Sequence, residues 1–251
     1  MAFTDRFSKR AGAYAAGRPS YPSASIDAIL AGLGEPATLV AADLGAGTGI
    51  SSRLIADRGA HVLAIEPNAA MRGAAQGDPR IEWIDGTAER TTLPDRSVDV
   101  VTAFQAWHWL DHALAVTETR RILRGGGRLA VVYNERDESD PFTAAYGEIV
   151  RRYATDATEE RRAKALAHAL GIDPARTTRE EFRNQQTLDR PGTHARAESS
   201  SYLPQTGPAA AAMHAAIDAL FDRFATEEAV EMHLVTTVVL VDLSQDPRSA
   251  I

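Results

Sequence analysis

The sequence contains no cysteine, and this absence excludes several kinds of chemistry. Without thiols the chain has no disulfides, no cysteine nucleophile and no cysteine-ligated zinc. Positive charge is also scarce: 27 basic residues stand against 34 acidic ones, which gives a formal net charge of -7. Such a balance argues against a surface that binds nucleic acid through its phosphates. We therefore predict no nucleic-acid partner, and we expect no metal site.

Long apolar runs are missing as well. No segment approaches the roughly 18 consecutive apolar residues of a membrane helix, and the N-terminal stretch MAFTDRFSKRAGAY is charged, unlike a secretory signal. We therefore expect a cytoplasmic protein without a membrane partner, while its oligomeric state stays open. The 251 residues, of which 44% are hydrophobic, suffice for one sizeable core, so we expect a single domain.

Apolar runs alternate with helical patterns along the chain, which predicts an α/β fold. The segment 39–66 contains an apolar run, a glycine-rich turn, a helix that Gly59 ends, and a second apolar run that ends on Glu66. This order indicates a right-handed βαβ unit and hence a parallel sheet. Further strands are expected at 81–83, 98–104, 128–133 and, closing the sheet, 235–243, with helices at 112–123 and 209–224.

The glycine-rich turn ADLGAGTG is the first candidate for a binding site. Asp43 ends a strand, and Gly45, Gly47 and Gly49 leave backbone N–H groups open to a polar ligand at a helix N-terminus. Glu66 stands 21 positions after Gly45, where a carboxylate can accept both ribose hydroxyl protons. The third glycine comes one residue too early for the dinucleotide fingerprint, so a nicotinamide oxidoreductase is disfavoured.

DLGAGTG followed by IEPNAAMR resembles the first two motifs of class I S-adenosylmethionine-dependent methyltransferases. The resemblance implies a Rossmann-like, seven-stranded, mostly parallel sheet with helices on both faces and an antiparallel last strand. It also implies S-adenosylmethionine as cofactor and S-adenosylhomocysteine as product. By matching position, the cofactor residues are Asp43, Gly45, Ala46, Gly47, Gly49, Glu66, Pro67, Met71, Thr87, Ala88, Glu89, Phe104 and Gln105. Many members carry Asp where Thr87 stands, and the backbone of Ala88 could replace that contact.

Three further segments, FSKRAGAYAAGRPSYP, QAWHW and ESSSYLP, look like the subgroup of trans-aconitate methyltransferases, whose members methylate small molecules. This likeness implies that the N-terminal segment closes over the cofactor. Residues 1–251 then form one methyltransferase domain, divided into an N-terminal lid at 1–25, a cofactor-binding core at 36–135, a cap or substrate insertion at 140–190, and the C-terminal part of the sheet at 191–251. The polar residues 141–170 could equally be ordinary surface helices.

Two groups of side chains have open roles. In the N-terminal segment, Arg18 could pair with the carboxylate of the cofactor or anchor the segment to the core, and Tyr14 and Tyr21 could contact cofactor and substrate respectively or merely pack. After the strand 98–104, Trp107 and Trp109 could wall the substrate and the sulfonium, or lie in the core.

His108, between the two tryptophans, is the candidate catalytic residue, as a base or as an orienting group, with a structural role as the alternative. We expect methyl transfer to a carboxylate or hydroxyl oxygen. Carbon or nitrogen acceptors, and a cofactor-binding regulatory protein without turnover, are the alternatives.

Overall fold

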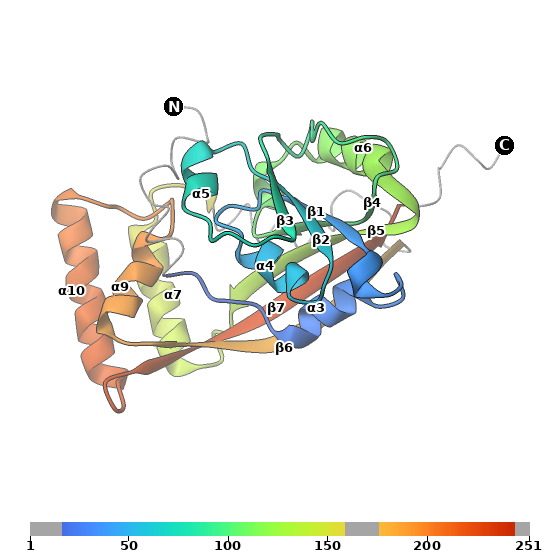
Figure 1. The fold of residues 1–251 in the computed structure, drawn as a ribbon. Coiled ribbons are helices and arrows are strands. Elements are labelled where there is room, and N and C mark those ends of the chain that lie inside the picture. Colours follow the sequence, from blue (N-terminus) through green and yellow to red (C-terminus); the bar gives the residue numbers. More distant parts are fainter. Residues whose placement is uncertain (1–16, 159–175, 244–251) are drawn as a thin grey trace.

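The computed structural model describes residues 17–158 and 176–243, and the described strands form one seven-stranded sheet in the order β3-β2-β1-β4-β5-β7-β6 (Figure 1). The strands are β1 (Val40–Leu44), β2 (His61–Ile65), β3 (Ile81–Ile84), β4 (Val98–Phe104), β5 (Leu123–Arg136), β6 (Thr177–Leu188) and β7 (Val230–Asp242). The helices are α3 (Ser23–Leu30), α4 (Ile50–Ala56), α5 (Ala69–Gly73), α6 (His112–Ile122), α7 (Pro141–Tyr153), α9 (Arg190–Glu198) and α10 (Gly207–Phe224), with short 3-10 turns at Pro36–Thr38 and Trp107–Trp109.

Strand direction confirms the expected sheet. Strands β1 to β5 pair in parallel, whereas β7 runs antiparallel to both of its neighbours, β5 and β6. The chain order reverses at β1, which pairs with β2 on one side and with β4 on the other. In open α/β sheets ligands bind at the carboxyl ends of the strands beside such a reversal, so the fold places a crevice next to β1 and β4.

Helices cover both faces of the sheet. On one face α3 and α4 bury Ile26, Ile29 and Ile55 completely, and on the other α6 buries Ala115 and Ile122. Burial of each large aliphatic side chain stabilises the fold by about 1.5–3 kcal/mol. The helices thereby fix the ends of β1 and β4, from which the crevice residues project.

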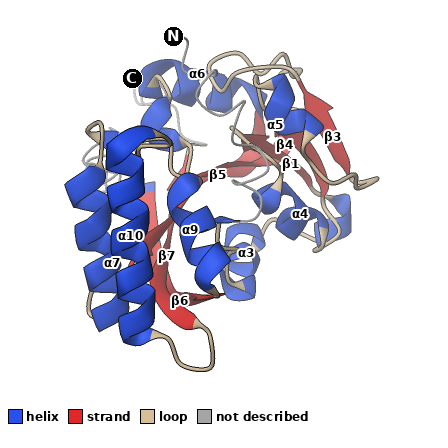
Figure 2. Cartoon of the chain, turned by 90° about the vertical axis from the view of Figure 1, so that its left-hand side faces the viewer, coloured by secondary structure: helices blue, strands red, loops and turns tan. Residues whose placement is uncertain are grey.

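A third group of helices packs beyond the parallel part of the sheet. Figure 2 shows α7 and α10 side by side, with α9 next to them. Buried side chains from all three helices, including Tyr146, Ala197 and Phe221, share a core with Met232 of β7. This C-terminal helical group brings α9 toward the crevice.

The expected insertion at 140–190 is wrong in part. Thr177–Leu188 is the edge strand β6, and it pairs with β7 over its whole length. Most of its side chains are exposed because the strand has a neighbour on one side only, so it lacks the apolar alternation that predicts a strand. Residues 159–175 of that insertion and 1–16 of the expected lid, including Tyr14, lie outside the described residues.

Two leucines allow a test of where the core lies. Leu129 of β5 is completely buried, whereas the side chain of Leu114 on α6 is 55% exposed. We expect Leu129→Ala to lower the free energy of unfolding by about 2–5 kcal/mol, because it removes buried methyl groups and leaves a cavity. Leu114→Ala should change it by less than about 0.5 kcal/mol. Urea unfolding followed by circular dichroism measures both, and equal losses would contradict this core.

Candidate functional site

Asp43 supports the glycine-rich turn from beneath. Its carboxylate accepts hydrogen bonds from the hydroxyls of Ser51 (2.6 Å) and Ser52 (2.7 Å) on α4 and of Thr102 (2.8 Å) on β4. Complete burial raises the pKa of Asp43, and these three hydroxyl donors lower it in part. Asp43 thus joins β1, α4 and β4 below the turn instead of contacting a cofactor as the sequence led us to expect.

The backbone of the turn favours glycine at three positions. Gly45, Gly47 and Gly49 have positive φ angles of 66°, 59° and 78°, which L side chains rarely adopt. A Cβ atom at Gly45 would lie 2.9 Å from the Cβ of Ala106, and one at Gly49 would lie 3.0 Å from the ring of Trp83. Gly49 therefore serves the packing of α4 against β3, while Gly45 keeps the backbone open toward the crevice.

Glu66, at the end of β2, faces the same turn. One carboxylate oxygen accepts the N–H of Gly47 at 2.9 Å and the other accepts the N–H of Asn68 at 2.8 Å. Burial raises the pKa of the Glu66 carboxyl, and the two backbone donors lower it in part. A carboxylate has about four lone-pair positions, so Glu66 keeps acceptor capacity for a ligand.

Glu66 lies in the wall of the larger of two adjoining cavities, which measures about 1000 Å³ with its opening to solvent included. The wall combines a polar end with an apolar one. Its residues are Gly45, Gly47, Glu66, Pro67, Asn68, Met71, Thr87, Ala88, Glu89, Phe104, Gln105, Ala106, Trp109 and Leu110.

These residues suit an adenosine group. Glu66 can accept bonds from two ribose hydroxyls, and the buried side chains of Met71 and Ala88 offer apolar contacts to a flat base. The carboxylate of Glu89 accepts the backbone N–H of Asp111 at 2.9 Å, so it is already used to hold the loop before α6. The larger cavity therefore fits the nucleoside part of S-adenosylmethionine.

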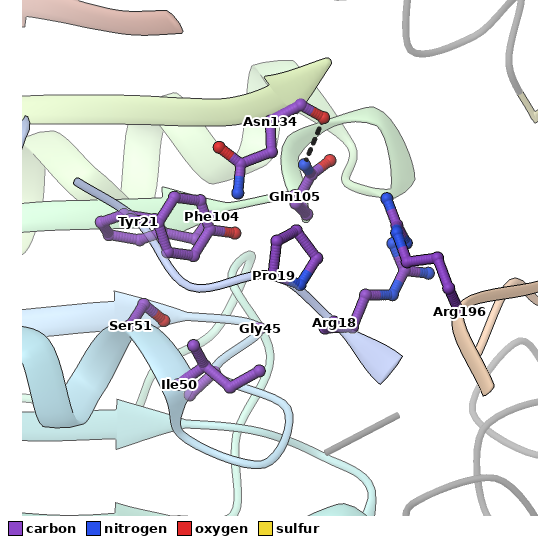
Figure 3. A pocket seen from close by; sticks show the side chains of 11 residues that line it. Arg18, Pro19, Tyr21, Gly45, Ile50, Ser51, Phe104, Gln105, Asn134 and Arg196 are labelled. Carbon is purple, nitrogen blue, oxygen red and sulfur yellow. Dashed lines mark hydrogen bonds between the residues drawn. The ribbon is translucent and has the colours of Figure 1, made fainter. Parts of the chain in front are cut away.

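A smaller cavity adjoins the first; it measures about 420 Å³ with its opening to solvent included, and Figure 3 shows the side chains that line it. Its wall consists of Arg18, Pro19, Tyr21, Gly45, Ala46, Ile50, Ser51, Phe104, Gln105, Asn134 and Arg196. Gly45, Phe104 and Gln105 line both cavities. A ligand that fills the larger cavity can therefore present its end to a second molecule in the smaller one.

The residues that line both cavities are held in place by a ring contact and a hydrogen bond. The rings of Phe104 and Tyr21 meet edge to face, with centroids 4.7 Å apart. Gln105 has a positive φ of 54°, and its side-chain amide donates to the carbonyl of Asn134 at 2.9 Å. A non-glycine residue held in this strained conformation is typical of functional sites.

The aromatic segment after β4 divides into three environments. Trp107 is completely buried and stacks on His112 at 5.5 Å, so the expectation that it binds substrate is wrong. Trp109 lines the larger cavity. His108 lies between them in sequence, and the hydroxyl of Tyr133 accepts its backbone N–H at 3.0 Å and lies 3.1 Å from its Nδ1.

Comparison with known proteins shows which protein family this region resembles. Residues 42–131, which carry β1 to β5 and the walls of the larger cavity, match the family model described as a methyltransferase domain. This part of the chain is a methyltransferase domain. The match ends before the C-terminal helical group, so it does not cover Arg196.

Curated relatives are methyltransferases too. An uncharacterised methyltransferase of Mycobacterium tuberculosis is 43% identical over 147 residues, which are 58% of this chain and 59% of that protein. The trans-aconitate 2-methyltransferase of Azoarcus sp. is 39% identical over 103 residues, which are 39% of this chain and 40% of the relative. The chain thus matches about three fifths of the length of the mycobacterial relative.

Solved structures share the fold of this methyltransferase domain. A protein named as a type II methyltransferase, from Anaeromyxobacter dehalogenans, is similar with a TM-score of 0.63 and 22% identity over 89% of this chain and 96% of the other. A protein assigned to an antibiotic biosynthesis pathway of Anabaena variabilis gives 0.61 and 24%, over 87% of this chain and 96% of the other. Both likenesses extend beyond residue 131, so the C-terminal strands belong to the same class I fold.

None of the described helices is long and apolar enough to cross a membrane. Nor do three or more histidine or acidic side chains gather within 17–158 and 176–243 in a way that could hold a metal ion.

Most of the residues expected from the sequence meet at the two cavities of the methyltransferase domain. Those outside the walls are Asp43, Gly49, Trp107, His108 and, beyond the described residues, Tyr14. Several wall residues were not predicted: Pro19, Ile50, Ser51, Asn68, Ala106, Leu110, Asn134 and Arg196. Asn68 caps α5 and follows Glu66 closely, so capping rules could have found it. Arg196 carried no signal, because one arginine in a polar helix is ordinary.

Gly45 provides a test of the turn geometry. Gly45→Ala should lower the free energy of unfolding by about 1–2 kcal/mol through its left-handed backbone, and it should displace Ala106 from the cavity wall. Gly77→Ala is the matched control, since nothing lies within 4 Å of a Cβ atom there. Urea unfolding measures both variants. Equal stability of Gly45→Ala and wild type would contradict the close approach.

Proposed function

We propose that the protein is an S-adenosylmethionine-dependent methyltransferase that methylates an oxygen of a small molecule, a carboxylate or a hydroxyl. The observation that carries this proposal is Glu66, a buried carboxylate with free acceptor capacity beside the glycine-rich turn. The family match over 42–131 supports it. The acidic net charge favours an enzyme without a nucleic-acid partner, and a cytoplasmic location is part of the proposal.

When bound, S-adenosylmethionine would supply an electrophilic methyl group on its sulfonium. The chain has to hold an acceptor in line with that methyl at about 3 Å and keep water away. Glu66 would fix the ribose, and Met71 would pack on the adenine. Phe104 and Tyr21, at the junction with the smaller cavity, would exclude water from the transfer.

The accepting atom decides whether a base is required. A carboxylate is ionised at neutral pH and needs none, whereas a hydroxyl must lose its proton. The similarity to a trans-aconitate 2-methyltransferase supports an oxygen acceptor. Incubation with an acceptor panel and S-adenosylmethionine, followed by mass spectrometry, distinguishes esters and ethers from carbon or nitrogen products. Binding without any turnover across the panel would favour a regulatory protein.

Glu66 can be tested without knowledge of the acceptor. Calorimetry should detect binding of S-adenosylhomocysteine, and Glu66→Ala should weaken it by about 1.5–3 kcal/mol, because charge-assisted bonds to the ribose are lost. Since the ionised carboxylate is the better acceptor, affinity should also fall as the pH drops through the raised pKa of Glu66, and Glu66→Gln should remove this pH dependence. Glu82→Ala, on the exposed side of β3, should bind like wild type. Unchanged affinity in Glu66→Ala would remove Glu66 from the site.

His108 separates the two kinds of acceptor. We propose that it orients an ionised carboxylate of an acceptor that extends beyond the two cavities, whose walls His108 does not line. With Nδ1 accepting from the Tyr133 hydroxyl, the ring proton sits on Nε2 and can be donated to the acceptor. His108→Asn should then raise KM more than it lowers kcat. If His108 were a general base, His108→Asn would instead lower kcat about a hundredfold or more and remove the acidic limb from the pH profile of kcat. That second result would contradict the orienting role and indicate a hydroxyl, amine or carbon acceptor.

A further inference from the structure

The smaller cavity contains a buried positive charge that binding of the nucleoside does not explain. Arg196, on α9, lines this cavity together with Arg18. Arg196 is nevertheless buried, with only 8% of its surface exposed. Figure 3 shows the two side chains next to each other at one end of the cavity, beside Gln105. They lie far apart in the sequence, so the fold has brought them together.

Arg196 lacks the partners that a buried arginine normally has. Arg18 donates to the backbone carbonyl of Ser199 at 3.1 Å. Nε of Arg196 is buried without a hydrogen-bond partner, and no carboxylate within residues 17–158 and 176–243 pairs with its guanidinium. Buried charges in proteins are normally paired, because an unpaired one loses its hydration without compensation.

The surroundings of Arg196 are positive. Burial, and next the charge of Arg18, lower the pKa of Arg196 to about 10, so it remains protonated at neutral pH. The other groups that act on it are Arg136 and the hydroxyls of Tyr146 and Tyr202, and burial raises the pKa of Tyr146 to about 12, which keeps that hydroxyl neutral. No acidic residue is among those that line the smaller cavity.

The charge balance identifies the occupant. The amino-acid end of S-adenosylmethionine carries one ammonium and one carboxylate, so it adds no net negative charge beside Arg196. A carboxylate on the second molecule would supply that charge. Resting on the proposed function, we propose that Arg196 binds a carboxylate of the methyl acceptor in the smaller cavity. Its planar guanidinium matches a carboxylate with two parallel N–H bonds, and Arg18 remains for the cofactor.

Succinate and citrate are suitable probes, and neutral succinamide is the matched control ligand. Calorimetry on the full chain saturated with S-adenosylhomocysteine should show binding of at least one carboxylate and not of succinamide. Arg196→Gln should weaken that binding about tenfold or more. Arg196→Lys keeps the positive charge but lacks the planar guanidinium, so it should weaken the binding less. Arg190→Gln, which removes an exposed arginine of the same helix paired with Asp218 and Asp222, should bind like wild type.

Three results would overturn the proposal. The first is a wild-type protein that binds neither carboxylate better than succinamide, and the second is an Arg196→Gln variant with unchanged affinity. The third concerns the source of the carboxylate: if Arg196→Gln weakens S-adenosylhomocysteine but not 5′-methylthioadenosine, which lacks the amino-acid part, the cofactor is the occupant. Failure of the wild type to bind S-adenosylhomocysteine would contradict the proposed function, and titration of the ligand-free protein with succinate would still decide on Arg196.

Thermal melting separates binding from folding. Because an unpaired buried charge destabilises the fold, ligand-free Arg196→Gln should melt no lower than wild type, and citrate or succinate should raise the Tm of the wild type alone. A lower Tm of the variant together with an unchanged response to the carboxylates would assign Arg196 to the fold and overturn its role in binding.

Discussion

The buried carboxylate of Asp43 is the constraint on which the site depends. It ties the end of β1 to the first turn of α4 and to β4 through three hydroxyl donors, in a place that water does not reach. In a low-dielectric interior such bonds are strong, and each is costly to leave unmade. The turn above Asp43 can therefore keep its left-handed glycine backbone, which leaves Gly45 exposed to both cavities and Gly47 bonded to Glu66.

The two cavities differ in the chemistry of the residues that line them. The larger one has the acceptor capacity of Glu66 and the apolar wall that a nucleoside requires, and the smaller one has the cationic side chains. Their shared wall, Gly45, Phe104 and Gln105, lies where the carboxyl ends of β1 and β4 meet. Methyl transfer depends on alignment of the acceptor with the methyl group and on exclusion of water more than on a reactive side chain. A wall that is held by packing and by the hydrogen bond between Gln105 and Asn134 suits this requirement.

The C-terminal third of the chain completes this site. Strand β7 inserts between β5 and β6, and the core shared by α7, α9 and α10 orients α9 so that Arg196 reaches the smaller cavity. The segment before α3 supplies Arg18 and Tyr21 from the other end of the sequence. The family match over residues 42–131 covers neither segment.

The sequence by itself determined the parallel sheet, the glycine-rich turn and the position of Glu66, because these features depend on local spacing: apolar period, glycine conformation and the length of one βαβ unit. It could not reveal β6, whose polar side chains face solvent along the sheet edge and show no apolar alternation. Nor could it separate Trp107, packed in the core, from Trp109 at the cavity wall two positions later. The meeting of Arg18 and Arg196 was decided by tertiary structure alone, since the packing of α9 with α7 and α10 brings two arginines that lie far apart in the sequence into one cavity.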